Sequence, residues 1–107
     1  MSKAEPINSV AKACRLMKEA AHMGVWGLSE MARAMDEPVS SVERLVATLA
    51  AEGFVERIGT GPNWRIGKEA AAIWSSYCLA LKKTIRDARR RLEEVHVPGS
   101  EVSEWMN

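Results

Sequence analysis

Apolar residues recur every three or four positions along the first half of the chain, as expected for helices with one buried face. The spacing predicts a helix over 9–22, with Asn8 or Ser9 capping its start. It also predicts helices over 29–35 and 40–52, the latter capped by Ser40. The inward stripe expected for the first helix is Val10, Ala13, Cys14, Met17, Ala20 and Ala21.

The middle of the chain alternates instead of following a helical period. The segment 54–58 and a short returning segment at 64–66 flank the turn-forming run Gly59-Thr60-Gly61-Pro62-Asn63, which predicts a β-hairpin over 54–66. A long helix is then predicted from Lys68 to about His96, where Pro98-Gly99 ends it. This order predicts a mainly α fold: a winged helix-turn-helix of three helices plus a two-stranded β wing, with a long C-terminal helix.

Charge is distributed unevenly over the predicted domains. Residues 8–67 are the predicted winged helix-turn-helix domain, 68–97 the long helix, and 98–107 a short acidic tail. The net charge is only +1, and residues 1–67 carry eight Lys or Arg against eight Asp or Glu. Residues 68–92 hold seven basic and two acidic side chains, and 93–107 hold four Glu and no Lys or Arg. The basic side chains are therefore concentrated on the long helix.

The long helix has the most regular apolar spacing of the chain. Steps of four and three residues, lasting about three heptads, place one apolar stripe along it, formed by Trp74, Cys78, Leu81, Ile85, Ala88, Leu92 and Val95. Such a stripe needs a partner, and a second copy would make a homodimer through Trp74, Cys78, Leu81, Ile85 and Leu92. The alternative is that the stripe packs across the chain's own helix at 9–22. The flanking Lys82, Arg89 and Arg91 are all positive and supply no attraction between two copies.

The pair of helices at 29–35 and 40–52 has the spacing of a helix-turn-helix, whose second helix enters a DNA major groove. Hydroxyls suit phosphate oxygens, Arg44 suits a guanine edge and Glu43 suits a cytosine amino group. The DNA-facing candidates of this helix are Ser40, Ser41, Glu43, Arg44 and Thr48, and those of the hairpin are Arg57, Thr60, Asn63 and Arg65. The alternatives are an ordinary three-helix core that binds nothing, and a hairpin whose arginines are simply solvated.

Three segments of this region occur in a specific order. They are Leu28-Ser29-Glu30-Met31-Ala32, then Pro38-Val39-Ser40-Ser41-Val42-Glu43-Arg44-Leu45, then Leu49 to Arg57 with Gly53-Phe54-Val55-Glu56 inside. Over residues 8–67 they closely resemble the N-terminal DNA-binding domain of IclR-type transcriptional regulators. The resemblance implies that Ser40, Ser41 and Arg44 lie at a DNA surface and that the hairpin from Arg57 to Arg65 is the wing. Two positions depart from the family pattern, Val39 for a basic residue and Glu43 for His.

The remaining sequence offers little for other functions. His22 and His96 stand alone, and neither a phosphate-binding glycine loop nor a metal-ligand spacing is present, so we expect no enzyme, no metal and no cofactor. No targeting or membrane-spanning stretch is visible, and Cys14 and Cys78 are interpreted as buried thiols of a cytoplasmic protein. The expected function is a sequence-specific regulator that binds double-stranded DNA and lacks an effector domain. The alternative is a winged-helix adaptor that binds other proteins in a larger assembly.

Overall fold

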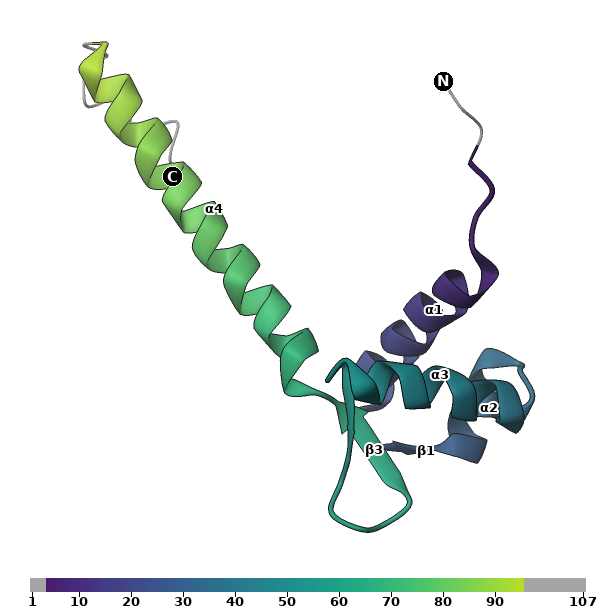
Figure 1. Cartoon of the computed structure of the whole chain (residues 1–107). Helices are drawn as coiled ribbons and strands as arrows, with labels where there is room; N and C mark the ends of the chain where they lie inside the picture. Colours follow the sequence, from purple (N-terminus) through teal and green to yellow (C-terminus); the bar gives the residue numbers. More distant parts are fainter. Residues whose placement is uncertain (1–3, 96–107) are drawn as a thin grey trace. The chain divides into compact units, whose positions relative to one another are not determined.

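The computed structural model describes residues 4–95 and contains the predicted order of elements. The helices are α1 (Asn8–Met23), α2 (Leu28–Met35), α3 (Val39–Ala51) and α4 (Lys68–Glu94) (Figure 1). The strands are β1 (Trp26–Gly27), β2 (Val55–Arg57) and β3 (Asn63–Ile66). The predicted fold class, a winged helix-turn-helix with a long C-terminal helix, is confirmed.

The sheet has one strand more than the sequence predicted. Its order is β1-β3-β2, and all pairs are antiparallel. Strand β1 pairs Trp26 with Trp64 and Gly27 with Asn63, so the predicted two-stranded wing is part of a three-stranded sheet. Two residues are too few to show an alternating pattern, and this strand therefore left no periodic signal in the sequence.

Helices α1, α2 and α3 each begin one residue earlier than predicted, and the expected capping side chains are not used. Helix α1 already includes Asn8 and Ser9, and Ile7 is its N-cap residue. Helix α3 likewise includes Ser40 and follows Pro38, whose extended backbone precedes the first turn. The prediction that Asn8 or Ser9, and Ser40, cap these helices is wrong, because those residues lie inside the first turn. Helix α2 follows Gly27, whose N–H donates to Glu30 Oε1 at 3.4 Å.

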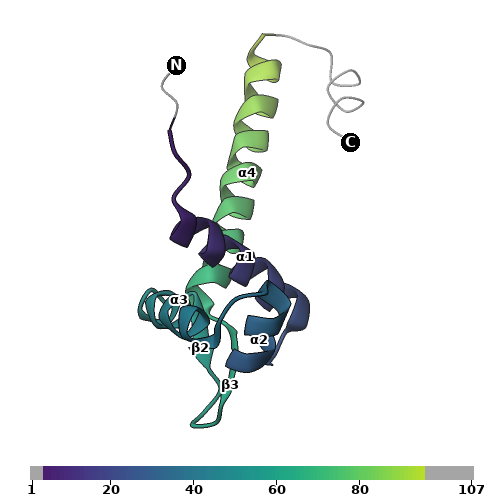
Figure 2. The same ribbon diagram turned by 90° about the vertical axis from the view of Figure 1, so that its right-hand side faces the viewer.

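The core of the winged unit lies where α1, α2 and α3 meet the sheet (Figure 2). The largest fully buried side chains are Trp26, Leu16, Met31, Val42 and Val55. Helix α1 contributes Leu16 and Ala20 to this core, whereas Val10 and Cys14 are exposed. The buried face of α1 is therefore rotated from the predicted stripe, and its exposed edge carries part of that stripe.

The two thiols are not buried as predicted. Cys14 is exposed on α1, and Cys78 is partly exposed on α4. The prediction failed at Cys14 because the residues of the first stripe lie on two neighbouring faces of α1. Only one of these faces meets the core.

The residues divide into two compact units, one extending to Ala72 and one starting at Ile73. The first turn of α4 belongs to the winged unit, because Glu69 N–H donates to Gly53 O and Gly67 N–H donates to Phe54 O. None of the residues of α4 is fully buried. The predicted helix end at Pro98-Gly99 and the acidic tail 98–107 lie outside the described residues. Among residues 4–95 no helix is long and apolar enough to cross a membrane.

Candidate nucleic-acid interface

Helix α3 presents one polar face to solvent and buries the other. Val42 and Val46 are buried in the core, and Leu45 and Leu49 pack against it. The opposite face consists of the predicted contact residues, of which Ser40, Glu43, Arg44 and Thr48 are exposed and Ser41 is half-buried. The Thr48 hydroxyl donates to Arg44 O at 3.2 Å, so it is partly occupied within the helix. The five predicted residues of this helix thus share one accessible surface.

The N-terminus of α1 borders this surface, which the sequence had not indicated. A depression of about 230 Å³ lies between the two helices, lined by Asn8, Ser9 and Lys12 of α1 and by Ser41, Arg44, Leu45 and Thr48 of α3. Lys12 and Arg44 bring two cations to its walls. No pattern in the sequence marks this juxtaposition, because it depends on how α1 crosses α3.

The two wing arginines occupy different environments. The Arg57 guanidinium lies over the Trp64 ring, 5.2 Å from its centre, and Trp64 stacks on the buried Trp26 with ring centres 6.3 Å apart. Arg57, Trp64 and Trp26 therefore form a stack that extends into the core, and the Trp64 ring holds the Arg57 cation by a cation–π contact. Arg65 instead donates from Nε to Glu56 Oε1 at 2.9 Å across the strand pair. Arg57 is therefore the wing cation without a carboxylate partner among the described residues.

The remaining wing candidates are Thr60 and Asn63. Thr60 is exposed in the turn between β2 and β3. Asn63 is the first residue of β3 rather than part of the turn, and its carbonyl accepts from Ile58 N–H at 2.9 Å. Its backbone is thus fixed by the sheet, and its exposed side chain lies next to the turn of the wing.

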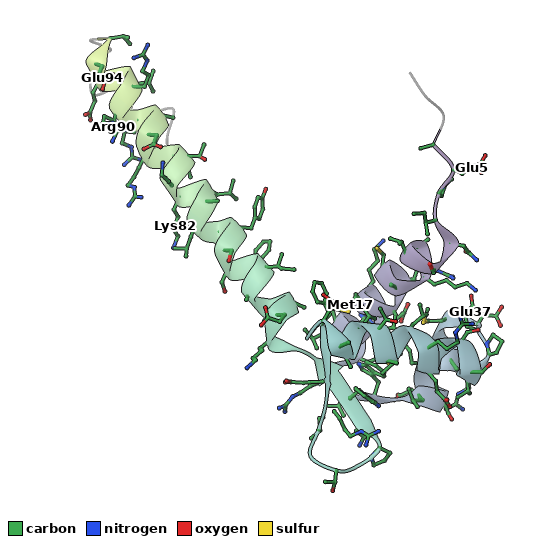
Figure 3. All side chains as sticks on the ribbon, in the orientation of Figure 1. Glu5, Met17, Glu37, Lys82, Arg90 and Glu94 are labelled. Atoms are coloured by element: carbon green, nitrogen blue, oxygen red, sulfur yellow. The ribbon has the colours of Figure 1, made fainter. Side chains whose placement is uncertain are left out.

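The turn between α2 and α3 is tied to α1 by one carboxylate. Glu37 Oε1 lies 3.2 Å from Lys12 Nζ and 3.3 Å from Arg15 Nη2, and its side chain is only 14% exposed. The preceding Asp36 has a left-handed backbone with φ of 53°, which ends α2. Glu37, labelled in Figure 3, therefore fixes the turn that orients α3. The sequence had indicated only a helix stop at this position.

Replacing Glu37 by glutamine is expected to lower the free energy of unfolding by about 1 kcal/mol, because it removes the negative charge from a poorly hydrated pair of contacts. Urea denaturation of the full chain measures the change. The matched control is Glu56→Gln, which removes one exposed ion pair and should cost less than about 0.5 kcal/mol. If both variants lose the same free energy of unfolding, the inference that Glu37 fixes the turn is wrong.

Comparison with known protein families identifies the domain to which the α3 surface belongs. The model of the IclR helix-turn-helix domain matches residues 9–59, from the start of α1 into the turn of the wing. Residues 9–59 are an IclR helix-turn-helix domain. The match contains the α3 residues and Arg57, whereas Thr60, Asn63 and Arg65 lie beyond it.

Three known proteins are similar to part of this chain. The transcriptional repressor IclR of Escherichia coli is 31% identical over 72 residues, which are 66% of this chain and 26% of the repressor. The crystal structure of HmgR from Pseudomonas aeruginosa has a TM-score of 0.63 and 22% identity, and the match covers 83% of this chain and 38% of HmgR. A protein from Silicibacter sp. TM1040, assigned as an IclR transcriptional regulator, has a TM-score of 0.63 and 26% identity. The match with it covers 81% of this chain and 34% of that protein.

This chain therefore spans between about a quarter and two fifths of each of these three relatives. Among the described residues, no three His, Cys, Asp or Glu side chains are grouped closely enough to hold a metal ion.

Proposed function

We propose that this protein is a sequence-specific transcriptional regulator that binds double-stranded DNA in the cytoplasm. The observation that carries the proposal is the solvent-exposed polar face of α3 within an IclR helix-turn-helix domain. The E. coli relative is a transcriptional repressor, and a shared domain is the reason for extending DNA binding to this chain.

In the proposed complex, α3 lies in the major groove. Arg44 is exposed and lies in the N-terminal half of α3. From this position its guanidinium would donate to the O6 and N7 acceptors of a guanine. Ser40 and Ser41 lie in the first turn, where hydroxyls and free amide groups suit a phosphate. Glu43 is exposed on the same face and would accept from a cytosine amino group, which makes it a specificity residue rather than a source of affinity.

The wing supplies contacts to the DNA backbone in this proposal. Arg57 is held over Trp64 and carries its charge at the edge of the sheet. Arg65 pairs with Glu56, so its net attraction to phosphate is smaller. Thr60 in the turn and Asn63 at the start of β3 add polar groups.

A homodimer would present two copies of α3 to two half-sites of one operator. The apolar stripe of α4 is the proposed dimer contact, because Trp74, Leu81 and Ile85 are each at least 43% exposed in the single chain. Cys78 and Leu92 lie on the same stripe and are partly exposed.

The proposal is tested by selecting a preferred duplex from a random pool and measuring its affinity for two variants. Arg44→Ala should cost about 1–3 kcal/mol on the preferred duplex and little on duplexes altered at one base pair. Arg57→Ala should weaken preferred and altered duplexes by the same factor, because a phosphate contact carries no sequence information. Fluorescence anisotropy with labelled duplexes measures both.

A triple variant, Arg44→Ala with Arg57→Ala and Arg65→Ala, checks the whole surface. Wild-type affinity of this variant for every duplex would show that α3 and the wing do not bind DNA. The second candidate function, a winged-helix adaptor, would then be preferred. It is favoured by the exposed Glu43 and Val39 at the tip of α3, which suit a protein surface better than a phosphate chain.

A further inference from the structure

The two arginines of the wing lie on opposite faces of the sheet. In the register of β2 against β3, Arg57 pairs with Trp64 and the neighbouring Glu56 pairs with Arg65. Residues paired across two strands share a face, and neighbours along one strand alternate between faces. Arg57 and Trp64 therefore share the face of Val55, which is buried in the core. Arg65 shares the opposite face with Glu56.

The face that carries Arg57 is the one that the helices cover. Val55 belongs to the core that α1, α2 and α3 share with the sheet, and Trp64 packs against this core. Helix α3, whose polar face is the proposed DNA surface, therefore lies on the same side of the sheet as Arg57. Of the two wing arginines, Arg57 is the one on the α3 side.

The Trp64 ring is held in place by a strand pair and by a second ring. Strand β1 pairs with β3 at Trp26 and Trp64. The two rings are stacked, with their centres 6.3 Å apart and 18° between their planes. Trp26 is only 1% exposed, so its ring is packed on all sides. The half-buried Trp64 ring is therefore an ordered surface at the edge of the core.

The Arg57 guanidinium depends on this ring for its position. It lies 5.2 Å from the ring centre, and within residues 4–95 it makes no hydrogen bond or ion pair. An arginine side chain loses conformational entropy when it is immobilised on a phosphate. The ring orders the side chain before DNA binds, and it does so without neutralising the charge, as a carboxylate would.

We propose that Trp64 is a positioning residue of the DNA interface. Its ring holds the Arg57 guanidinium on the α3 side of the wing, where the guanidinium donates to a backbone phosphate. This inference rests on the proposed function and adds to it a residue that acts through Arg57. Arg65 is the contrasting case, because its ion pair with Glu56 at 2.9 Å orders the side chain by neutralising its charge.

NMR of the full chain without DNA tests the contact itself. Protons above an aromatic ring are shifted upfield, so the side-chain protons of Arg57 should resonate upfield of those of Arg65. This difference should disappear in Trp64→Leu and persist in part in Trp64→Phe, which keeps a ring. Arg57 protons with the same shifts in the wild type and in Trp64→Leu would overturn the inference.

A double-mutant cycle tests the role of the contact in DNA binding. Fluorescence anisotropy measures the affinity of the preferred duplex for the wild type, Trp64→Leu, Arg57→Ala and the double variant. Trp64→Leu should weaken binding about fivefold, because the DNA contact must then order Arg57 by itself. In the Arg57→Ala background the same change should have no effect.

The salt dependence of the affinity separates positioning from loss of the cation. It should become shallower by about one phosphate contact in Arg57→Ala. Trp64→Leu should keep the wild-type salt dependence, because the guanidinium is still present and still reaches the phosphate.

Two further variants serve as controls. Trp64→Phe keeps an aromatic ring in the core and protects the test against unfolding of Trp64→Leu. It should weaken binding about twofold when Arg57 is present and not at all in Arg57→Ala. Arg65→Ala is the matched background for the cycle, and Trp64→Leu should still weaken binding about fivefold there, because Arg65 lies on the opposite face.

The possible failures are distinguishable. If the Trp64 variants weaken binding by the same factor with and without Arg57, the role of Trp64 is only structural and the inference is wrong. It is also wrong if the folded Trp64 variants bind as tightly as the wild type. In both cases Arg57→Ala still weakens binding and the proposed function stands. A wild-type chain that binds no duplex refutes the proposed function, and this inference with it.

Discussion

A chain with Ile85→Lys and Leu92→Lys together is expected to be monomeric at about 10 µM, where the wild-type chain is expected to be dimeric. Each fully buried Leu or Ile contributes about 1.5–3 kcal/mol by leaving water, and the change also places two cations in the stripe. Ile85 is half exposed in the single chain, so its replacement should leave the winged unit folded. Sedimentation velocity measures the assembly, and circular dichroism measures the fold. Affinity for a two-half-site duplex should fall by about 100-fold as the second copy is lost.

Ser75→Lys with Ser76→Lys is the control for the added charge and should leave the dimer intact. The stripe is not a dimer contact if the wild-type chain is monomeric at the same concentration. If the winged unit unfolds in the variant with Ile85→Lys and Leu92→Lys, the stripe is part of the protein's own core instead.

Gly67→Ala is expected to lower the free energy of unfolding by about 3 kcal/mol, because its new methyl group has no room. Gly67 is buried, and a Cβ there would overlap the Gly53 carbonyl oxygen and lie 3.1 Å from the Phe54 carbonyl carbon. These are backbone atoms, held by hydrogen bonds from Gly67 N–H to Phe54 O at 2.8 Å and from Glu69 N–H to Gly53 O at 3.2 Å. The backbone therefore cannot move to make room for the methyl group without breaking these hydrogen bonds, which hold the segment between β3 and α4 against Gly53 and Phe54.

Gly61→Ala is the matched control, since the nearest neighbour of a Cβ at this position is Ile58 O, at an ordinary contact distance of 3.8 Å. It should change the free energy of unfolding by less than about 0.5 kcal/mol. Urea denaturation compares the two variants, and equal unfolding midpoints would show that the join at Gly67 is not tightly packed.

The order of the elements was readable from the sequence because each helix of the fold repeats its apolar residues over several turns. Val42 and Val46 of α3 are buried as the period requires. The period could not show which edge of α1 faces the core, since Leu16 is buried there while Cys14 on the neighbouring face is exposed. Strand β1 left no periodic signal because it has only two residues, Trp26 and Gly27.

The candidate surface was predictable on α3 and less so elsewhere. Successive turns of one helix place Ser40, Glu43 and Arg44 together, so local spacing was sufficient. The support of Arg57 by Trp64 was not predictable, because it depends on the register of β2 against β3. Glu37 is far along the chain from Lys12 and Arg15, and only the crossing of α1 past the turn brings them together.

The cations on the second half of α4 have a consequence for how the protein responds to ionic strength. Lys83 and Arg90 both form ion pairs with Asp87, and the hydrogen bond that Lys83 donates lowers the pKa of that carboxyl. Lys82, Arg86 and Arg89 make no ion pair with the described residues. In a dimer these free charges repel each other across the pair, and at 0.1 M salt such repulsion is screened beyond about 10 Å. DNA binding responds in the opposite sense, because salt weakens every phosphate contact. Rising salt should therefore strengthen the proposed dimer and weaken its binding to DNA, so the protein should dissociate from DNA as a dimer.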